Sequence, residues 1–329
     1  MTDRTAPSTR RLVLRRLALL PVIVLAVATL TFALTEISPF DPVRAYVGSE
    51  SQLSPQRRAQ IEHAYGFDQP IYERYGRWLA HVARGDFGHS LVAGGQPVAG
   101  EIASRASATL VLVGGALVIV LLGGLVFGVL AAAFRGSVFD WLVRTLCYFN
   151  TAAPSFWIGL LALYLFSVKL GWLPAGGTID PRAVDASGIA PAHIVLPMLV
   201  LALTQYAWFT LYVRNTMLEV LREDHIQFAR AQGIGEVAVL LRHALPNALV
   251  PFVTLIGTNL SELIGGTILI EQIFGWPGLG ALTLQAAIRE DIPLLVAITL
   301  AASVLVVLGN LLADVLYRVL DPRVREATA

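Results

Sequence analysis

The chain has 329 residues, of which 56% are hydrophobic and only 14% are charged, and its formal net charge is +1. Soluble domains carry about 25% charged residues, so this composition predicts a polytopic membrane protein. The near-zero net charge provides no basic field, which argues against nucleic acid as a partner. The single cysteine, Cys147, lies in an apolar run and predicts a buried thiol rather than a disulfide.

The first apolar run, Leu17–Leu34, follows a stretch with four arginines and has the polarity of a secretory signal peptide. However, it contains 18 uncharged residues, and no small-x-small cleavage site follows it. Because this length approaches what the hydrocarbon core of a bilayer requires, we interpret the run as a retained first transmembrane helix.

Five further apolar stretches have the length of a transmembrane helix, and their pattern shows no alternation typical of a barrel. Lipid offers no partner to unpaired backbone groups, so each stretch must be helical. The predicted fold is therefore all-α with six transmembrane helices. These are 17–34, 106–134, 145–168, 186–213, 248–270 and 292–313.

The distribution of Lys and Arg predicts the orientation of these helices. With the N-terminus inside, the inner segments carry 14 of these residues, whereas the two short outer loops carry three. We therefore expect cytoplasmic tails at 1–16 and 314–329 and a cytoplasmic segment at 215–246. The outer loops are then the long loop 35–105 and two short ones, 271–291 and the one between the third and fourth helices that carries Lys169 and Arg182.

The long outer loop has helix signals of its own. Ser54 followed by a proline is an N-terminal cap, and Gly66 ends that pattern. Pro70 opens a second helix, which ends near Gly85. These helices predict a small cap packed on the outer face rather than a separate binding domain.

The sequence lacks the motifs of nucleotide hydrolysis and of common hydrolases. A Walker A loop needs Gly-Lys-Ser or Gly-Lys-Thr, but the single lysine, Lys169, follows Val168. The sequence Gly88-His89-Ser90 does not continue into a nucleophile elbow, and no cysteine–histidine spacing suits zinc. We expect no catalytic residue, no metal site and no bound cofactor in this chain.

The polar segment between the fourth and fifth helices predicts a helix–turn–helix. Apolar residues after Gly235 recur at the helical spacing i, i+3, i+4, i+7, and Gly233 and Gly235 allow a turn before them. The predicted stripe consists of Val237, Leu240, Leu241 and Ala244, and the upstream helix presents Leu221, His225, Phe228 and Ala229. Spacing alone also allows two helices that lie on the bilayer surface.

This segment resembles the EAA loop of binding-protein-dependent ABC importer permeases, whose pattern is E-A-A-x-x-x-G, nine residues, then I-x-L-P. Ala229, Gly233, Leu245 and Pro246 fall in register, whereas Gln227 and Phe228 replace the first E-A, and His243 replaces the isoleucine. The replacement of the acidic residue resembles the dipeptide, oligopeptide and nickel branch. Further segments similar to that branch are DPVRAYVG (41–48), YGFDQPIYERYGRWL (65–79), RGDFGHSL (84–91), APSFWIGL (153–160), LGWLPAGG (170–177), EQIFGWPGLG (271–280) and LDPRVR (320–325).

The resemblance implies a type I importer permease of the bacterial inner membrane, with a permease domain over about 100–325. It implies a peptide-like or metal-chelate substrate, an extracytoplasmic binding protein, a second similar permease and two cytoplasmic ATPases that hold ATP and Mg²⁺. The implied coupling residues are Gln227, Phe228, Ala229, Gly233, Gly235, Glu236, Leu245 and Pro246. The alternatives are a secondary carrier or channel without an ATPase, and a membrane-embedded hydrolase.

Three further features carry separate predictions. Glu262 costs about 2.5–3.5 kcal/mol on insertion scales, so it should face the interior or water, where it could meet a substrate ammonium group, a metal complex or Asn259. Gly124 and Gly128 form a small-x-x-x-small pair that suits close helix packing. The pair Phe274 and Trp276 is expected to anchor at the outer interface of the membrane.

Overall fold

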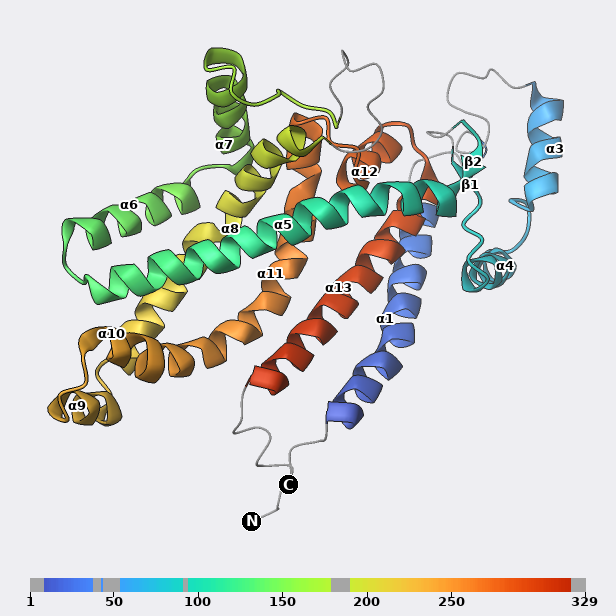
Figure 1. The fold of residues 1–329 in the computed structure, drawn as a ribbon. Coiled ribbons are helices and arrows are strands. Elements are labelled where there is room, and N and C mark those ends of the chain that lie inside the picture. Colours follow the sequence, from blue (N-terminus) through green and yellow to red (C-terminus); the bar gives the residue numbers. More distant parts are fainter. Residues whose placement is uncertain (1–8, 38–42, 44–53, 91–93, 179–189, 321–329) are drawn as a thin grey trace. The chain divides into compact units, whose positions relative to one another are not determined.

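The computed structural model describes residues 9–37, 43, 54–90, 94–178 and 190–320. Within these ranges, the side chains of 9–16, 64–65, 250–261, 313–314 and 316–320 lie outside the description. The described chain is helical apart from one short hairpin (Figure 1). It forms two compact units, 110–276 with both chain ends and 17–109 with 277–307.

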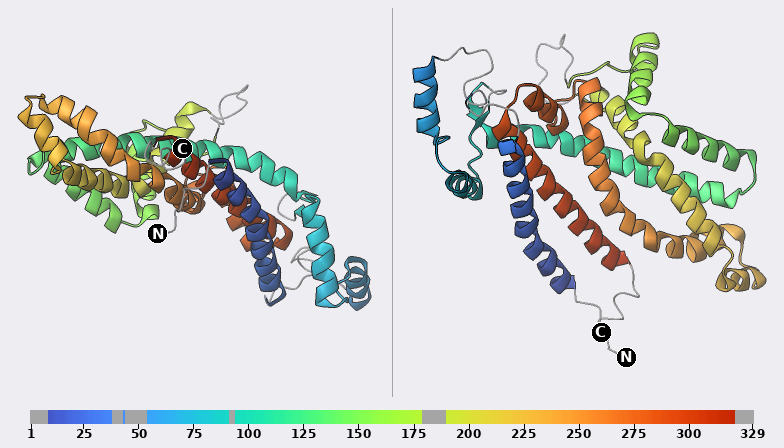
Figure 2. Two further views of the ribbon diagram at one scale, coloured as in Figure 1. Left: turned by 90° about the horizontal axis from the view of Figure 1, so that it is seen from below. Right: turned by 180° about the vertical axis from the view of Figure 1, so that it is seen from behind.

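The first unit contains the end of α5 and the helices up to α11, and α8 lies at its centre. Helices α6, α7 and α11 all pack on α8, and Figure 2 shows α8 and α11 side by side in both views. The elements are α5 (Val98–Ala133), α6 (Val138–Ala152), α7 (Ser155–Ala162), η1 (Leu163–Lys169), α8 (Pro191–Val220), α9 (Asp224–Ala231), α10 (Glu236–Ala238), η2 (Val239–Ala244) and α11 (Leu245–Ile273).

Two glycines bring α5 against α8. A Cβ atom on Gly124 would lie 2.9 Å from Cβ of Phe209, and one on Gly128 would lie 2.7 Å from Cβ of Val213. These distances are shorter than van der Waals contact, so only glycine permits this approach, as the small-x-x-x-small pair predicts. Cys147 is fully buried among neighbouring apolar side chains, which confirms the predicted buried thiol.

The predicted third transmembrane helix, 145–168, is not one straight helix. Helix α6 ends at Ala152, and the chain resumes in α7 and η1 after a bend of 109°. Ala153 adopts an extended conformation (ψ 134°) because the ring of Pro154 disfavours helical geometry at the preceding residue. The helix therefore breaks at Pro154, and α6 begins at Val138, seven residues before the predicted start of the transmembrane helix.

The second unit contains α1 (Thr9–Ile37) from Leu17 onward, the start of α5, and α13 (Ile292–Leu320) as far as Val307. Between them in the sequence it also contains α3 (Pro55–Tyr65), α4 (Ile71–Ala83), the hairpin β1 (His89–Ser90) and β2 (Gln96–Pro97), and α12 (Leu279–Ile288). The strands are antiparallel, with His89 opposite Pro97. The Ser54 side chain accepts from the Arg57 N–H, and Gly66 closes α3 at φ 68°, which confirms the predicted helix signals.

Helix α4 packs on α1 through aromatic rings and an ion pair. Phe32 lies against Tyr75 and Trp78, with ring centroids 5.2 and 5.3 Å apart. Arg74 pairs with Glu36 at 2.6 Å. Helix α4 is thus held on α1, whose residues Leu17–Ile37 are a candidate membrane span. The hairpin is anchored separately, because Ser90 Oγ donates to Asp291 Oδ2 at 2.7 Å beside the start of α13.

Among the described residues, four helices are long and apolar enough to cross a membrane, or five if the bent pair at Pro154 counts as one span. The four are Leu17–Ile37, Val98–Ala133, Pro191–Val220 and Ile292–Leu312. Helix α11 covers the predicted fifth transmembrane helix, 248–270, but most side chains of that range lie outside the description. The predicted outer loop 271–291 contains the short apolar helix α12.

Candidate coupling site

The coupling segment, residues 221–247, is the helix–turn–helix that the glycine pattern predicts. Helix α9 ends at Ala231, and Gly233 turns the chain at φ 80°, a left-handed conformation that favours glycine. The Ile234 N–H donates to the Ala229 carbonyl at 3.3 Å, which closes the helix end. The chain then continues through α10 and η2 into α11 without a break in helical backbone, and Pro246 lies in the first turn of α11.

The predicted apolar stripe of this segment is only partly buried. Ala244 is fully buried, but Val237 and Leu241 are 70% and 53% exposed, and Val239, which lies outside the predicted stripe, is fully buried. From Val239 to Ala244 the segment is a π-helical turn, η2, in which hydrogen bonds reach one residue further than in an α-helix. A 3.6-residue period therefore does not describe the buried face within this turn.

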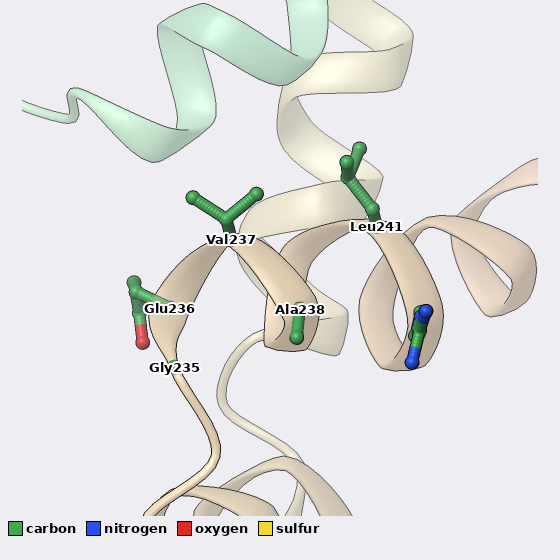
Figure 3. Close-up of a pocket in the computed structure, with 6 residues that line it drawn as sticks. Gly235, Glu236, Val237, Ala238 and Leu241 are labelled. Atoms are coloured by element: carbon green, nitrogen blue, oxygen red, sulfur yellow. The ribbon is translucent and has the colours of Figure 1, made fainter.

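The exposed side of the segment carries an apolar surface. Val237 and Leu241 extend to the same side of the helix, one turn apart, beside an open hollow (Figure 3). The lining residues are Gly235, Glu236, Val237, Ala238, Leu241 and Arg242. Phe228 on α9 is also 65% exposed, while Ile226 and Ala229 face inward. Exposed apolar side chains on a polar foot are typical of a protein–protein contact.

A bidentate ion pair closes the glycine turn. Arg230 Nε donates to Glu236 Oε2 at 3.1 Å, and Arg230 Nη2 donates to Glu236 Oε1. The hydrogen bond from Arg230 lowers the pKa of the Glu236 carboxyl, and the same bond raises the pKa of Arg230. Periodicity placed Glu236 only in the first helical turn. The pairing was missed because it joins two helices across a turn whose geometry is tertiary.

Two amide side chains tie the segment to the helices on either side. Gln227 Nε2 donates to the carbonyl of Leu221, just after α8, at 3.2 Å. A glutamate in this position could not donate, which gives a physical reason for glutamine where the family pattern has an acid. Asn247 Nδ2 donates to the His243 carbonyl at 2.8 Å, and this contact secures the entry into α11.

The structure brings all eight predicted coupling residues into one segment, but it exposes them unequally. The exposed ones are Gln227, Phe228, Gly233, Gly235, Glu236 and Pro246, whereas Leu245 is half-buried and Ala229 is buried. The burial of Ala229 indicates that the small residue of the pattern serves packing within the segment. Phe228, Val237 and Leu241 provide the accessible apolar surface instead.

A buried ion pair lies near the same end of α8 as the coupling segment. Arg214 donates from Nε to Asp140 Oδ1 at 2.6 Å and from Nη2 to Oδ2 at 2.8 Å. Asp140 is 1% exposed, and its Oδ2 also accepts from the Gly136 N–H at 3.0 Å. We call this pair the clamp. It joins residues 74 positions apart. Local sequence patterns show charged residues beside apolar runs, but they do not predict which of these residues pair.

Glu262 lies on an exposed stripe of α11. Glu262, Gly265, Leu269 and Gln272 are exposed at spacings of three and four residues, while Leu263, Thr267 and Ile270 are buried on the other side. The side chain of Asn259 lies outside the described residues, so its predicted pairing with Glu262 stays a prediction.

The predicted interfacial anchor after α11 is wrong. Phe274 and Trp276 are each 1% exposed and belong to the buried interior. The loop before α8 covers this end of α11, because the Gly177 N–H donates to the Phe274 carbonyl at 2.9 Å. A Cβ on Gly176 would lie 2.5 Å from that carbonyl oxygen, so the covering loop needs glycine there. Aromatic type alone could not distinguish an anchor from a core residue.

Comparison with known proteins identifies the family. Residues 124–326 match the family model "Binding-protein-dependent transport system inner membrane component", and residues 9–113 match the model of its N-terminal region. The chain is 38% identical over 312 residues to the oligopeptide transport system permease protein AppB of Bacillus subtilis, covering 95% of this chain and 98% of that protein. It is also 38% identical to the di/tripeptide transport system permease protein DppB of Pseudomonas aeruginosa, covering 94% and 97%.

The fold has a counterpart among solved structures. The inward-facing MetNI methionine ABC transporter contains a chain that matches with a TM-score of 0.55 and 20% identity, covering 67% of this chain and 96% of that chain. At this identity the likeness shows the fold, which is that of a type I importer permease. The chain belongs to the family of inner membrane components of binding-protein-dependent transport systems, and it is a permease subunit of such a system.

Proposed function

We propose that this permease imports peptide-like substrates, delivered by an extracytoplasmic binding protein, in an importer driven by separate ATPases. The observation that carries the proposal is the coupling segment, a braced helix–turn–helix with apolar side chains exposed on a polar foot. The names of the relatives AppB and DppB support a peptide-like substrate, and a metal chelate is the alternative within this family.

The assembly would contain a second similar permease and two cytoplasmic ATPases. Six transmembrane helices with both termini in the cytoplasm would place the coupling segment on the side where ATP is hydrolysed. ATP and Mg²⁺ would bind to the ATPases, and this chain would hold no cofactor and would contact protein partners, membrane lipid and the substrate.

The coupling segment would act as a handle. Phe228, Val237 and Leu241 would enter a cleft on an ATPase, where their burial removes apolar surface from water. The Arg230–Glu236 pair and the Gln227 hydrogen bond would keep the handle rigid, so that ATPase closure moves α8 and α11 with it. ATP must then bind one state of the complex more tightly than the other, because equal affinity shifts no equilibrium.

Co-purification of the detergent-solubilised permease tests this function. We expect two ATPase subunits for each permease pair, and loss of at least nine-tenths of that ATPase from a Val237→Asp, Leu241→Asp variant. Ile71→Asp is the matched control, because Ile71 is 54% exposed on α4 outside the coupling segment. Wild-type protein that retains no nucleotide-binding subunit would favour a secondary carrier, a channel or a hydrolase.

The exposed stripe of α11 would face the substrate pathway. A carboxylate in the middle of a transmembrane helix is too costly to face lipid, so the side that carries Glu262 and Gln272 should face water or protein. We expect Glu262→Gln to slow the uptake of lysine-containing tripeptides several-fold relative to neutral ones in reconstituted vesicles. ATPase co-purification should be unchanged. Equal uptake of both peptide types by wild type and variant would exclude this role of Glu262.

A further inference from the structure

We propose that Asp140 exchanges partners during the transport cycle, leaving Arg214 on α8 for Arg144 on its own helix. The exchange keeps the buried Asp140 carboxylate paired as α8 moves against α6, and Arg214 keeps the hydrogen bond from Nη1 to Asn215 Oδ1 (3.2 Å) on its own helix. This inference rests on the proposed function, since it concerns how the movement of the coupling segment passes into the membrane helices.

The present state of the clamp favours Arg214. Both carboxylate oxygens of Asp140 are bonded by its guanidinium, at 2.6 and 2.8 Å. Arg214 is itself only 11% exposed by side chain. It lies two turns before the end of α8, and the coupling segment follows directly. A push on the coupling segment therefore reaches Arg214 through a continuous helix.

Arg144 is the second partner, and it already forms a longer ion pair with Asp140 although its side chain is 37% exposed. It lies four residues after Asp140 on α6, and its Nε atom is 3.4 Å from Asp140 Oδ1. That Nε is buried and has no hydrogen-bond partner among the described residues. A buried N–H left without a partner is costly, so a state that satisfies it would gain a charge-assisted hydrogen bond.

The other contacts of Asp140 belong to the α6 side and can survive the exchange. The Gly136 N–H donates to Oδ2 at 3.0 Å, and the Asp140 N–H donates to Ser137 Oγ at 3.2 Å. Gly136 has φ 78°, so the turn between α5 and α6 depends on a glycine. Release of Arg214 would leave Asp140 held by this turn and by Arg144.

Helix packing indicates which contacts must change when α8 moves against α6. Gly124 and Gly128 bring α5 into close contact with α8 near Phe209 and Val213. Helix α6 packs on α8 through a buried apolar cluster that includes Cys147, and the Asn150 side chain donates to the Leu203 carbonyl. The clamp is the charged contact that must also open if α6 and α8 move apart. Separating a buried ion pair without a substitute partner is strongly unfavourable.

The experiment uses the assembled importer in lipid vesicles, with spin labels at Leu146 on α6 and Leu203 on α8 in a Cys147→Ala background. Both label sites are exposed. We expect ATP with vanadate to shift the label distance in the parent protein and in Arg144→Lys. In Arg144→Gln the distance should stay at its nucleotide-free value, and ATP hydrolysis should fall at least tenfold.

A variant in which Asp140, Arg144 and Arg214 are all neutral distinguishes partner exchange from structural damage. Arg144→Gln combined with Asp140→Asn and Arg214→Gln leaves no buried charge to strand, so the distance shift should return. The proposal is overturned if Arg144→Gln shifts like the parent, if Arg144→Lys is equally impaired, or if the neutral triple variant stays immobile. Failure of the proposed function has a different signature, because the parent itself would then retain no ATPase.

Discussion

Two arginine–carboxylate pairs of the same geometry occupy opposite environments in this permease. The clamp between Asp140 and Arg214 is 1% and 11% exposed, whereas Arg230 and Glu236 in the coupling segment are 34% and 59% exposed. Water screens the second pair, so its bidentate geometry contributes little free energy. The first pair lies where an unpaired charge is costly. Burial, rather than hydrogen-bond geometry, therefore decides how much such a pair matters to the stability of the fold.

The largest effect is expected at the clamp. Asp140→Asn should lower the free energy of unfolding by about 3–5 kcal/mol, because it leaves the Arg214 charge buried without its counterion. Thermal unfolding in detergent measures the loss. The double variant Asp140→Asn, Arg214→Gln should recover most of it. Equal stability of Asp140→Asn and wild type would show that the clamp is solvated in the membrane-embedded protein.

An intermediate effect is expected where α5 meets α8. Gly128→Ala places a Cβ 2.7 Å from Val213 Cβ and 2.9 Å from the Thr210 carbonyl oxygen, so the helices must separate. Overpacking of this kind costs about 1–3 kcal/mol. Gly114→Ala on the same helix is the matched control, since its added methyl meets no atom within 4 Å. The same unfolding assay should find the control at least as stable as wild type, and equal losses in both would argue against the tight contact.

The smallest effect is expected at the exposed pair. Glu236→Gln should change stability by less than about 1 kcal/mol. The pKa of Glu236 is lowered in the folded protein, so its contribution is present above the ordinary glutamate pKa of about 4.3 and is lost as pH falls through the lowered value. Stability measured from pH 8 to pH 5.5 should therefore show no difference in slope between wild type and variant. A slope difference in that window would require a folded-state pKa of Glu236 above its ordinary value, and it would contradict the lowering by Arg230.

Local sequence patterns predicted the helical character of the fold and the place of the coupling segment. Long apolar runs can only be helical in lipid, and glycines at 233 and 235 mark a turn whatever surrounds them. The Ala153-Pro154 pair is typical of a helix end, but the length of the apolar run predicted one continuous helix. The buried face of the coupling segment could not be predicted from a 3.6-residue period, because Val239–Ala244 form a π-helical turn.

The sequence by itself determined that this chain lies in a membrane and carries a polar helix–turn–helix segment between two of its long helices. Hydropathy and turn chemistry are properties of neighbouring residues, and they need no tertiary information. Only the tertiary structure decided that Phe274 and Trp276 are core residues and that Asp140 meets Arg214. Burial and pairing between residues far apart in the chain depend on which helices pack together, and no local pattern contains that choice.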